Sequence, residues 1–178
     1  MAHVDLVIAN GTVATETAVF EASIAVREGR IVAVGTAADM PPAAETIDAR
    51  GLYVLPGVID IHVHFREPGM DHKEDWTTGT RAAAMGGVTT VFEMPNTAPP
   101  VSTAARYKDK RQIASAKALV DFGLYGVISE DNLADLAPMA DAGVIGYKLF
   151  LGNTTGNLPC PSDGAVLEAF EIIAGLGK

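Results

Sequence analysis

The sequence predicts an α/β protein whose main part is the first half of a (β/α)8 barrel, preceded by a small β module. Four segments rich in valine and isoleucine alternate with four helical segments from Leu52 onward, a pattern typical of a parallel sheet. A doubly wound sheet would carry a G-x-G-x-x-G phosphate loop after its first strand, and none follows here. Polar side chains instead end the first, second and fourth strands, as the reactive groups of a (β/α)8 barrel do. A complete barrel takes roughly 250 residues, and residues 56–178 provide about half of that.

Residues 1–55 are predicted to form the small β module. "DLVIANGTVAT" places two apolar runs around Asn10-Gly11, a dipeptide that suits a type I′ hairpin turn. "ASIAVREGRIVAVGT" repeats the pattern around Glu28-Gly29, and a loop and one more short strand follow. No residue in this module suggests chemistry.

Four strand–helix pairs are predicted from Leu52 onward, and residues 56–178 are assigned to the barrel. The strands are "YVLPGVIDIHVHF", "VTTVFEMP", "ALVDFGLYGVI" and "VIGYKLFLG". The helices that follow them are "EDWTTGTRAAAMGG", "TAARYKDKRQIASAK", "DNLADLAPMADAG" and "SDGAVLEAFEIIAGLGK".

Composition excludes several classes of protein. A net charge of −9 over 178 residues argues against a nucleic-acid partner, which needs a concentrated basic face. No apolar run reaches the length of a membrane span, and the N-terminus lacks a signal-peptide pattern. A single cysteine, Cys160, excludes an internal disulfide framework. We therefore expect a globular cytoplasmic protein that binds neither nucleic acid nor membrane.

The segment "GVIDIHVHFREPG" places His62 and His64 at the end of the first barrel strand. Alternate residues of a strand point to one face, so both imidazoles can reach one metal ion. The alternative is a solvent-facing pair on an edge strand. Asp60 shares this parity, and could hold one imidazole or bond the backbone.

The wider motif resembles the dihydroorotase signature of the amidohydrolase superfamily. H-x-H-x-R is followed in order by E-P-G, H-K-E-D, an alanine-rich helix, G-G-V-T-T and M-P-N-T-x-P-P. The resemblance covers residues 4 to about 178. It implies a metal-dependent-hydrolase TIM barrel, with residues 1–55 as the N-terminal part of a composite β-sandwich.

The resemblance also implies site roles. His62 and His64 match ligands of the more buried of two divalent metal ions, usually zinc. Lys148, in "GYKLFLGNTTG", matches a lysine that many members carry as a carbamate bridging the two metals, although some dihydroorotases use an aspartate instead. A desolvated lysine loses its proton readily, which suits carbamate formation; the alternative is a solvated lysine on a half-exposed strand. The remaining histidine ligands and the general-base aspartate are expected beyond Lys178.

Arg66 and Asn96 match the pair that binds the substrate carboxylate. A guanidinium can hold a carboxylate through two parallel hydrogen bonds, and dihydroorotate carries one whereas hydantoins do not. The alternatives are an ion pair of Arg66 with Glu67 or Asp71, and a turn role for Asn96.

The leading hypothesis is therefore reversible interconversion of L-dihydroorotate and N-carbamoyl-L-aspartate in pyrimidine biosynthesis. The alternatives are an allantoinase, a hydantoinase or dihydropyrimidinase, and a non-catalytic homologue that acts as a scaffold. The expected partner is a small cyclic amide, and the expected assembly is a homo-oligomer. The 178-residue chain is expected to be inactive by itself, because four strand–helix units cannot close a barrel.

Overall fold

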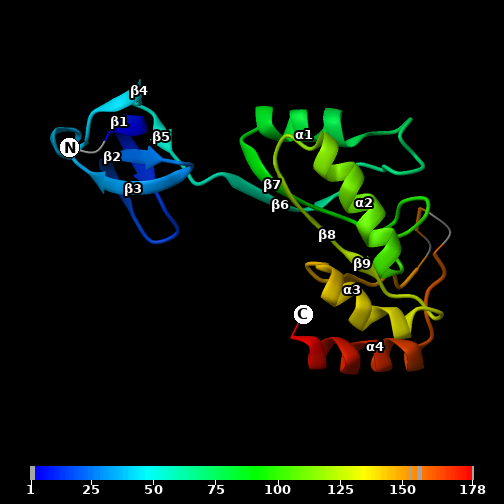
Figure 1. Ribbon diagram of the computed structural model, residues 1–178. Coiled ribbons are helices and arrows are strands. Elements are labelled where there is room, and N and C mark those ends of the chain that lie inside the picture. The colour runs from blue at the N-terminus through cyan, green and yellow to red at the C-terminus, as the bar shows by residue number, and fades with distance from the viewer. Residues whose placement is uncertain (1–2, 153, 156–157, 178) are drawn as a thin grey trace. The chain divides into compact units, whose positions relative to one another are not determined.

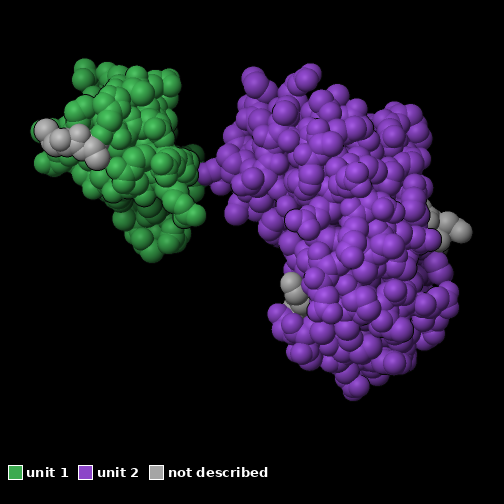
Figure 2. Space-filling model, viewed as in Figure 1, with its two compact units in different colours: residues 1–56 green, residues 57–178 purple. Residues whose placement is uncertain are grey.

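The computed structural model describes residues 3–152, 154–155 and 158–177. The chain divides into two compact units, Met1–Pro56 and Gly57–Lys178, which Figure 2 colours separately. No helix in the described part of the chain is long and apolar enough to cross a membrane.

The first unit is a five-stranded sheet of the order β3-β2-β1-β4, with β5 also paired to β1. Its strands are β1 (Val4–Ala14), β2 (Val19–Arg27), β3 (Arg30–Gly35), β4 (Ala43–Asp48) and β5 (Tyr53–Val54). β1, β2 and β3 are antiparallel neighbours, whereas β4 and β5 run parallel to β1. A short 3-10 helix, η1 (Ala37–Asp39), separates β3 from β4.

One of the two predicted hairpin turns in this unit is wrong. Glu28 and Gly29 do turn β2 into β3, both with positive φ, as a type I′ turn requires. Asn10, by contrast, lies within β1, where the pairing register with β2 shifts between Ile8 and Gly11. Its left-handed backbone forms a bulge rather than a turn, because its N–H donates to Ser23 Oγ (3.0 Å) on the partner strand.

The second unit contains a parallel sheet followed by a two-stranded extension. β6 (Val58–Val63), β7 (Val88–Glu93) and β8 (Asp121–Leu124) are hydrogen-bonded in that order. β9 (Gly126–Val127) pairs in parallel with β10 (Tyr147–Lys148). Only Tyr125 separates β8 from β9, and its N–H donates to the Glu93 carbonyl (3.1 Å). The predicted third strand is therefore interrupted, but the four predicted strands still follow one another in parallel.

Four α-helices follow the strands in chain order (Figure 1): α1 (Trp76–Met85), α2 (Ala104–Lys117), α3 (Leu136–Ala142) and α4 (Asp163–Leu176). A 3-10 turn, η2 (Leu133–Asp135), leads into α3. Side-chain caps fix three of the starts: Asp75, Thr103 and Ser162 each accept a hydrogen bond from the backbone three residues on. The alternation of strands and helices predicted from the sequence is confirmed.

The core of the second unit forms between the sheet and these helices. Trp76 is fully buried, with its ring against Phe65 (5.1 Å between ring centroids) and Phe122 (5.2 Å). Leu124, Leu136 and Met139 extend this core toward α3. Because Phe65 belongs to the segment that follows β6, the core also fixes the carboxyl end of the first barrel strand.

Candidate metal and substrate site

The carboxyl end of β6 brings His62 and His64 together. Their ring centroids lie 5.2 Å apart, with the ring planes inclined at 56°. Burial lowers the pKa of the half-buried His64 below 6.5, and the positive charge of Arg66 and the neighbouring His62 lower this pKa further. This environment favours neutral His64, the form that offers a nitrogen lone pair to a metal ion.

Asp60 does not hold an imidazole. Its Oδ1 accepts a hydrogen bond from the backbone N–H of His62 (3.1 Å), so of the two roles considered for Asp60 the structure shows the backbone one.

Arg66 follows His64 in an unusual conformation. Its φ of 64° lies in the left-handed region, which is unfavourable for a residue with a side chain. Its Nη1 is buried and has no hydrogen-bond partner in the described part of the chain. The expected alternative partner Glu67 pairs with Lys117 instead, and also accepts from the Trp76 N–H (3.0 Å). An unpaired, buried guanidinium nitrogen is costly, which fits a position that meets a ligand.

Asn96 lies in the loop after β7 and is 3% exposed. Its amide nitrogen donates to Thr154 Oγ1 (3.3 Å), whereas its Oδ1 is buried with no hydrogen-bond partner among the described residues. The Asn96 side chain raises the pKa of His64, which opposes the effect of burial. The loops after β6 and β7 are also joined through backbone, because the Ala98 N–H donates to the Pro68 carbonyl (3.0 Å). The loop that carries Asn96 is thus tied to the loop that follows His64.

Lys148 is the last residue of β10 and is half-buried. Its Nζ lies over the Phe150 ring, 5.2 Å from the centroid. Its backbone carbonyl accepts from the Ile128 N–H (3.0 Å), which extends the pairing of β9 with β10. Lys148 therefore ends a parallel strand, as the two histidines do, but its amine is engaged with an aromatic ring. The "GNTTG" segment that follows lies partly outside the described residues, at positions 153 and 156.

The described residues supply part of a metal-binding donor set. His62 and His64 are two nitrogen donors on one strand face, and a carboxylated Lys148 would add oxygen donors. Across residues 3–152, 154–155 and 158–177, no group of three or more histidine, cysteine, aspartate or glutamate side chains converges on one point. The pair fits a metal ion as two of its ligands, and a complete tetrahedral site needs more.

Sequence reasoning missed a buried ion pair next to this site. Glu93, the last residue of β7, contacts Lys110 of α2, and both side chains are almost fully buried. Burial raises the pKa of Glu93 and lowers that of Lys110, and each charge opposes the shift of the other. The available signal was that Lys110 shares a helix face with Tyr107 and Ala114, which are buried.

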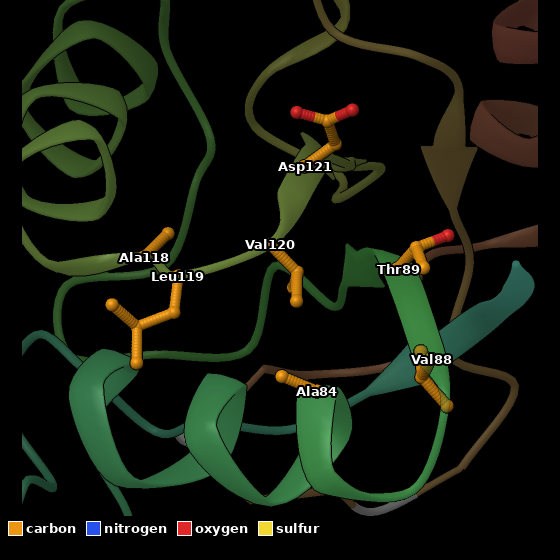
Figure 3. Close-up of a pocket in the computed structure, with 7 residues that line it drawn as sticks. All are labelled: Ala84, Val88, Thr89, Ala118, Leu119, Val120 and Asp121. Carbon is orange, nitrogen blue, oxygen red and sulfur yellow. The ribbon is translucent and has the colours of Figure 1, made fainter. Parts of the chain in front are cut away.

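A cavity of about 480 Å³ lies at the other end of the strands. Its lining includes Val88 and Asp121, the first residues of β7 and β8, together with Ala84 of α1 (Figure 3). The histidines follow the carboxyl end of β6, and parallel strands share their orientation. This cavity is therefore not part of the candidate site.

Comparisons with known proteins show the family of this chain. Residues 53–146 match the amidohydrolase family. The chain belongs to the amidohydrolase family. Residues 1–54 match the N-terminal domain of the urease alpha-subunit.

Among known relatives, an allantoinase of Solibacter usitatus is 41% identical over 175 residues, which are 97% of this chain and 38% of the relative. An allantoinase of Streptomyces avermitilis is 42% identical, over 99% of this chain and 40% of the relative. An L-hydantoinase of Paenarthrobacter aurescens is 34% identical, over 98% of this chain and 38% of the relative. The chain thus spans about two fifths of the length of these relatives.

Solved structures show the same fold. The L-hydantoinase (dihydropyrimidinase) of Arthrobacter aurescens superposes with a TM-score of 0.94 at 33% identity, over 98% of this chain and 39% of that chain. A D-hydantoinase superposes with a TM-score of 0.85 at 27% identity, over 98% of this chain and 38% of that chain. The predicted fold class is confirmed. These relatives and structures are allantoinases and hydantoinases, so the narrower assignment to dihydroorotase stays a prediction.

Proposed function

We propose that this chain contributes the first metal ligands and a substrate-selecting arginine to a metal-dependent cyclic amidohydrolase of the allantoinase and hydantoinase type. The observation that carries the proposal is the His62–His64 pair at the carboxyl end of β6, with Arg66 and Asn96 beside it. The names of the relatives support hydrolysis of a cyclic amide or ureide, and support allantoin or a hydantoin better than dihydroorotate.

Each residue has a defined role in this proposal. His62, His64 and a carboxylated Lys148 would hold divalent metal, zinc by the family resemblance. Bound metal would supply Lewis acidity toward water and the scissile carbonyl. The lowered pKa of His64 keeps its imidazole available as a ligand near neutral pH. Arg66 and Asn96 bind the part of the ring that does not react.

Zinc binding by the 178-residue chain tests the proposed metal-ligand roles of His62 and His64. We expect His62→Ala and His64→Ala each to weaken zinc binding measured by isothermal titration calorimetry, because each removes one of two neighbouring donors. His72→Ala is the matched control, since His72 is an exposed histidine of the same loop region. Equal zinc binding by the parent and both site variants would contradict the metal assignment.

Dihydroorotate is the second candidate substrate, and one observation favours it. The buried Nη1 of Arg66 lacks a partner among the described residues, and a ring carboxylate would give it a charge-assisted hydrogen bond. Allantoin and hydantoin offer this nitrogen only neutral acceptors, whereas a carboxylate adds an opposite charge and can take the guanidinium through two parallel hydrogen bonds.

A chimera can separate the candidates. This chain would replace the matching segment of the Arthrobacter aurescens L-hydantoinase, a graft that the TM-score of 0.94 supports. The chimera is assayed with allantoin, hydantoin, dihydrouracil and L-dihydroorotate, with and without Arg66→Met. A carboxylate role predicts a loss of kcat/KM of roughly 10- to 100-fold for dihydroorotate alone, the value of a hydrogen bond to a charged group. Similar losses on all four substrates would make Arg66 structural, and no metal-dependent turnover of any of them would contradict the proposed function.

We also propose that the chain associates with itself. Val58, Ile59 and Ile61 of β6 are more than half exposed, and β6 pairs only with β7 in the described structure. Exposed apolar side chains on an unpaired strand edge favour association. We expect size-exclusion chromatography to show an oligomer that Ile61→Lys weakens, while zinc binding by His62 is retained. A monomeric parent chain at high concentration would contradict this proposal.

A further inference from the structure

Glu93 and Lys110 form a buried ion pair between the end of β7 and the middle of α2. Their side chains are 1% and 2% exposed, respectively, and Lys110 Nζ contacts Glu93 Oε2. Lys110 also donates to the Met94 carbonyl (3.0 Å). Replacing a buried ion pair by apolar residues of similar size is often neutral or stabilising, so stability alone does not explain why charges lie here.

Glu93 lies beside the segment that leads into the turn after β6, because it pairs with Val63 and the Met94 N–H donates to the Val63 carbonyl (3.0 Å). Hydrogen bonding from the backbone of Phe65 and Arg66 lowers the pKa of the Glu93 carboxyl and so opposes the effect of burial. The Glu93 carboxylate therefore lies between this segment and the Lys110 ammonium. A carboxylate has enough acceptor positions for all three donors, whereas an apolar side chain has none.

The turn held in this way is unfavourable without such support. Arg66 has a φ of 64°, and a left-handed conformation costs an ordinary residue free energy. Both hydrogen bonds end on the residues directly after His64. The direction of the Arg66 side chain, and the orientation of the strand end that carries His64, depend on this backbone conformation.

We propose that the Glu93–Lys110 pair is a positioning device that holds the Phe65–Arg66 turn, and so orients Arg66 and His64 for the site. The functional role of this orientation rests on the proposed function, whereas the support of the turn by the ion pair does not. Glu93 and Lys110 touch neither metal nor substrate in this proposal. They act through the backbone of the turn.

The main test is the double variant Glu93→Gln/Lys110→Met in the 178-residue chain. It removes both charges together, so neither is left buried and alone, and glutamine keeps the shape of the glutamate with one acceptor oxygen fewer. Glu130→Gln is the control, because Glu130 also joins two segments by accepting from the Ser162 N–H, far along the chain from this turn.

We expect the double variant to exchange the amide protons of Phe65 and Arg66 about tenfold faster relative to the other amides of its sheet. We also expect shifted His64 imidazole resonances and zinc affinity about tenfold weaker, as for the loss of a group that orients a ligand. The control should leave all three unchanged. Trp76 fluorescence, which reports unfolding of the second unit, separates these local effects from a general loss of stability.

Unchanged amide exchange at Phe65 and Arg66 would overturn the proposal. Faster exchange with unaltered His64 resonances would also overturn it, since the pair would then support only the backbone. A parent chain that binds no zinc would contradict the proposed function, while the His64 resonances would still decide the positioning role. If the double variant does not fold, scalar couplings across the hydrogen bonds to the Glu93 carboxylate can be measured in the parent, and their absence would refute the device.

Discussion

Gly69, in the E-P-G segment, is the position where a single methyl group should damage the site most directly. It has a φ of 91°, and the loop after β7 lies against it. A Cβ atom at this position would overlap the Ala98 carbonyl oxygen and lie 2.7 Å from the Ala98 Cβ. The loop cannot easily withdraw, because the Ala98 N–H donates to the carbonyl of Pro68 (3.0 Å).

Two costs add in Gly69→Ala. The left-handed backbone costs alanine about 1–2 kcal/mol, and overpacking against a fixed backbone costs about 1–3 kcal/mol more. The expected loss is therefore about 2–5 kcal/mol, a large part of the 5–15 kcal/mol typical of a domain. Gly87→Ala is the matched control, since Gly87 has a φ of 81° but a Cβ added there would meet nothing within 4 Å. Only the backbone cost, about 1–2 kcal/mol, applies there.

Urea unfolding followed by Trp76 fluorescence measures both losses. Trp76 is the only tryptophan in the sequence and is fully buried in the second unit, so the signal reports that unit alone. The free energy of unfolding should fall by about 1–3 kcal/mol more for Gly69→Ala than for Gly87→Ala. Equal losses in the two variants would show that the two loops separate freely, and would refute the reasoning that they form one rigid support for Arg66 and Asn96.

Three further predictions concern other parts of the second unit. Burial raises the pKa of Tyr107, whose hydroxyl donates to the Gly143 carbonyl (2.8 Å). The folded state then holds this proton more tightly than the unfolded state. The resulting contribution to the free energy of unfolding is fully present below pH 10 and is lost as pH rises from about 10 through the folded pKa. In urea titrations, Tyr107→Phe should therefore flatten this alkaline decline. With zinc and ¹³C-bicarbonate, the parent should show a carbamate ¹³C signal that Lys148→Ala lacks, and a signal of equal size in the variant would contradict carboxylation at Lys148. Gly79→Ala should destabilise α1 although alanine favours helices by about 1 kcal/mol, because the new Cβ would lie 3.1 Å from Cγ of the Phe65 ring and closer to other ring atoms; a raised melting temperature would show that the ring moves aside.

The sequence predicted the architecture because its signals are local. Alternation of Val/Ile-rich runs with capped helices is a property of neighbouring residues, and the structure confirms it for all four pairs. The Asn10-Gly11 turn failed for a non-local reason: Asn10 bonds to Ser23 Oγ and Asp48 Oδ1, which lie on the strands at either side of β1. Those contacts favour a bulge inside one long strand over a turn between two.

In the candidate site, too, local sequence predicted some features and non-local contacts determined others. His62, His64 and Arg66 occur within five residues of one motif, so strand parity alone placed the two histidines together. Glu93 and Lys110 are far apart in the sequence, and only the packing of α2 against the parallel sheet makes them partners. In a sequence, such a pair is indicated by a charged residue on the buried face of an amphipathic helix. This pattern predicts that the charge has a partner, but not which residue the partner is.

The two faces of β6 explain how one strand can serve both the fold and the site. Ile59 and Ile61 share one parity and Asp60 and His62 the other, so apolar side chains lie on one face and polar ones on the opposite face. Both faces are exposed in the described structure. Burial of Ile59 and Ile61 requires an apolar surface packed against them. A metal ion bound by His62 requires further ligands on the opposite face. These demands are met on opposite sides of the sheet, so what packs against the isoleucine face can change without altering the metal ligands. The proposed self-association through β6 and the proposed metal binding at its carboxyl end should therefore be separable by substitutions on the two faces of this strand.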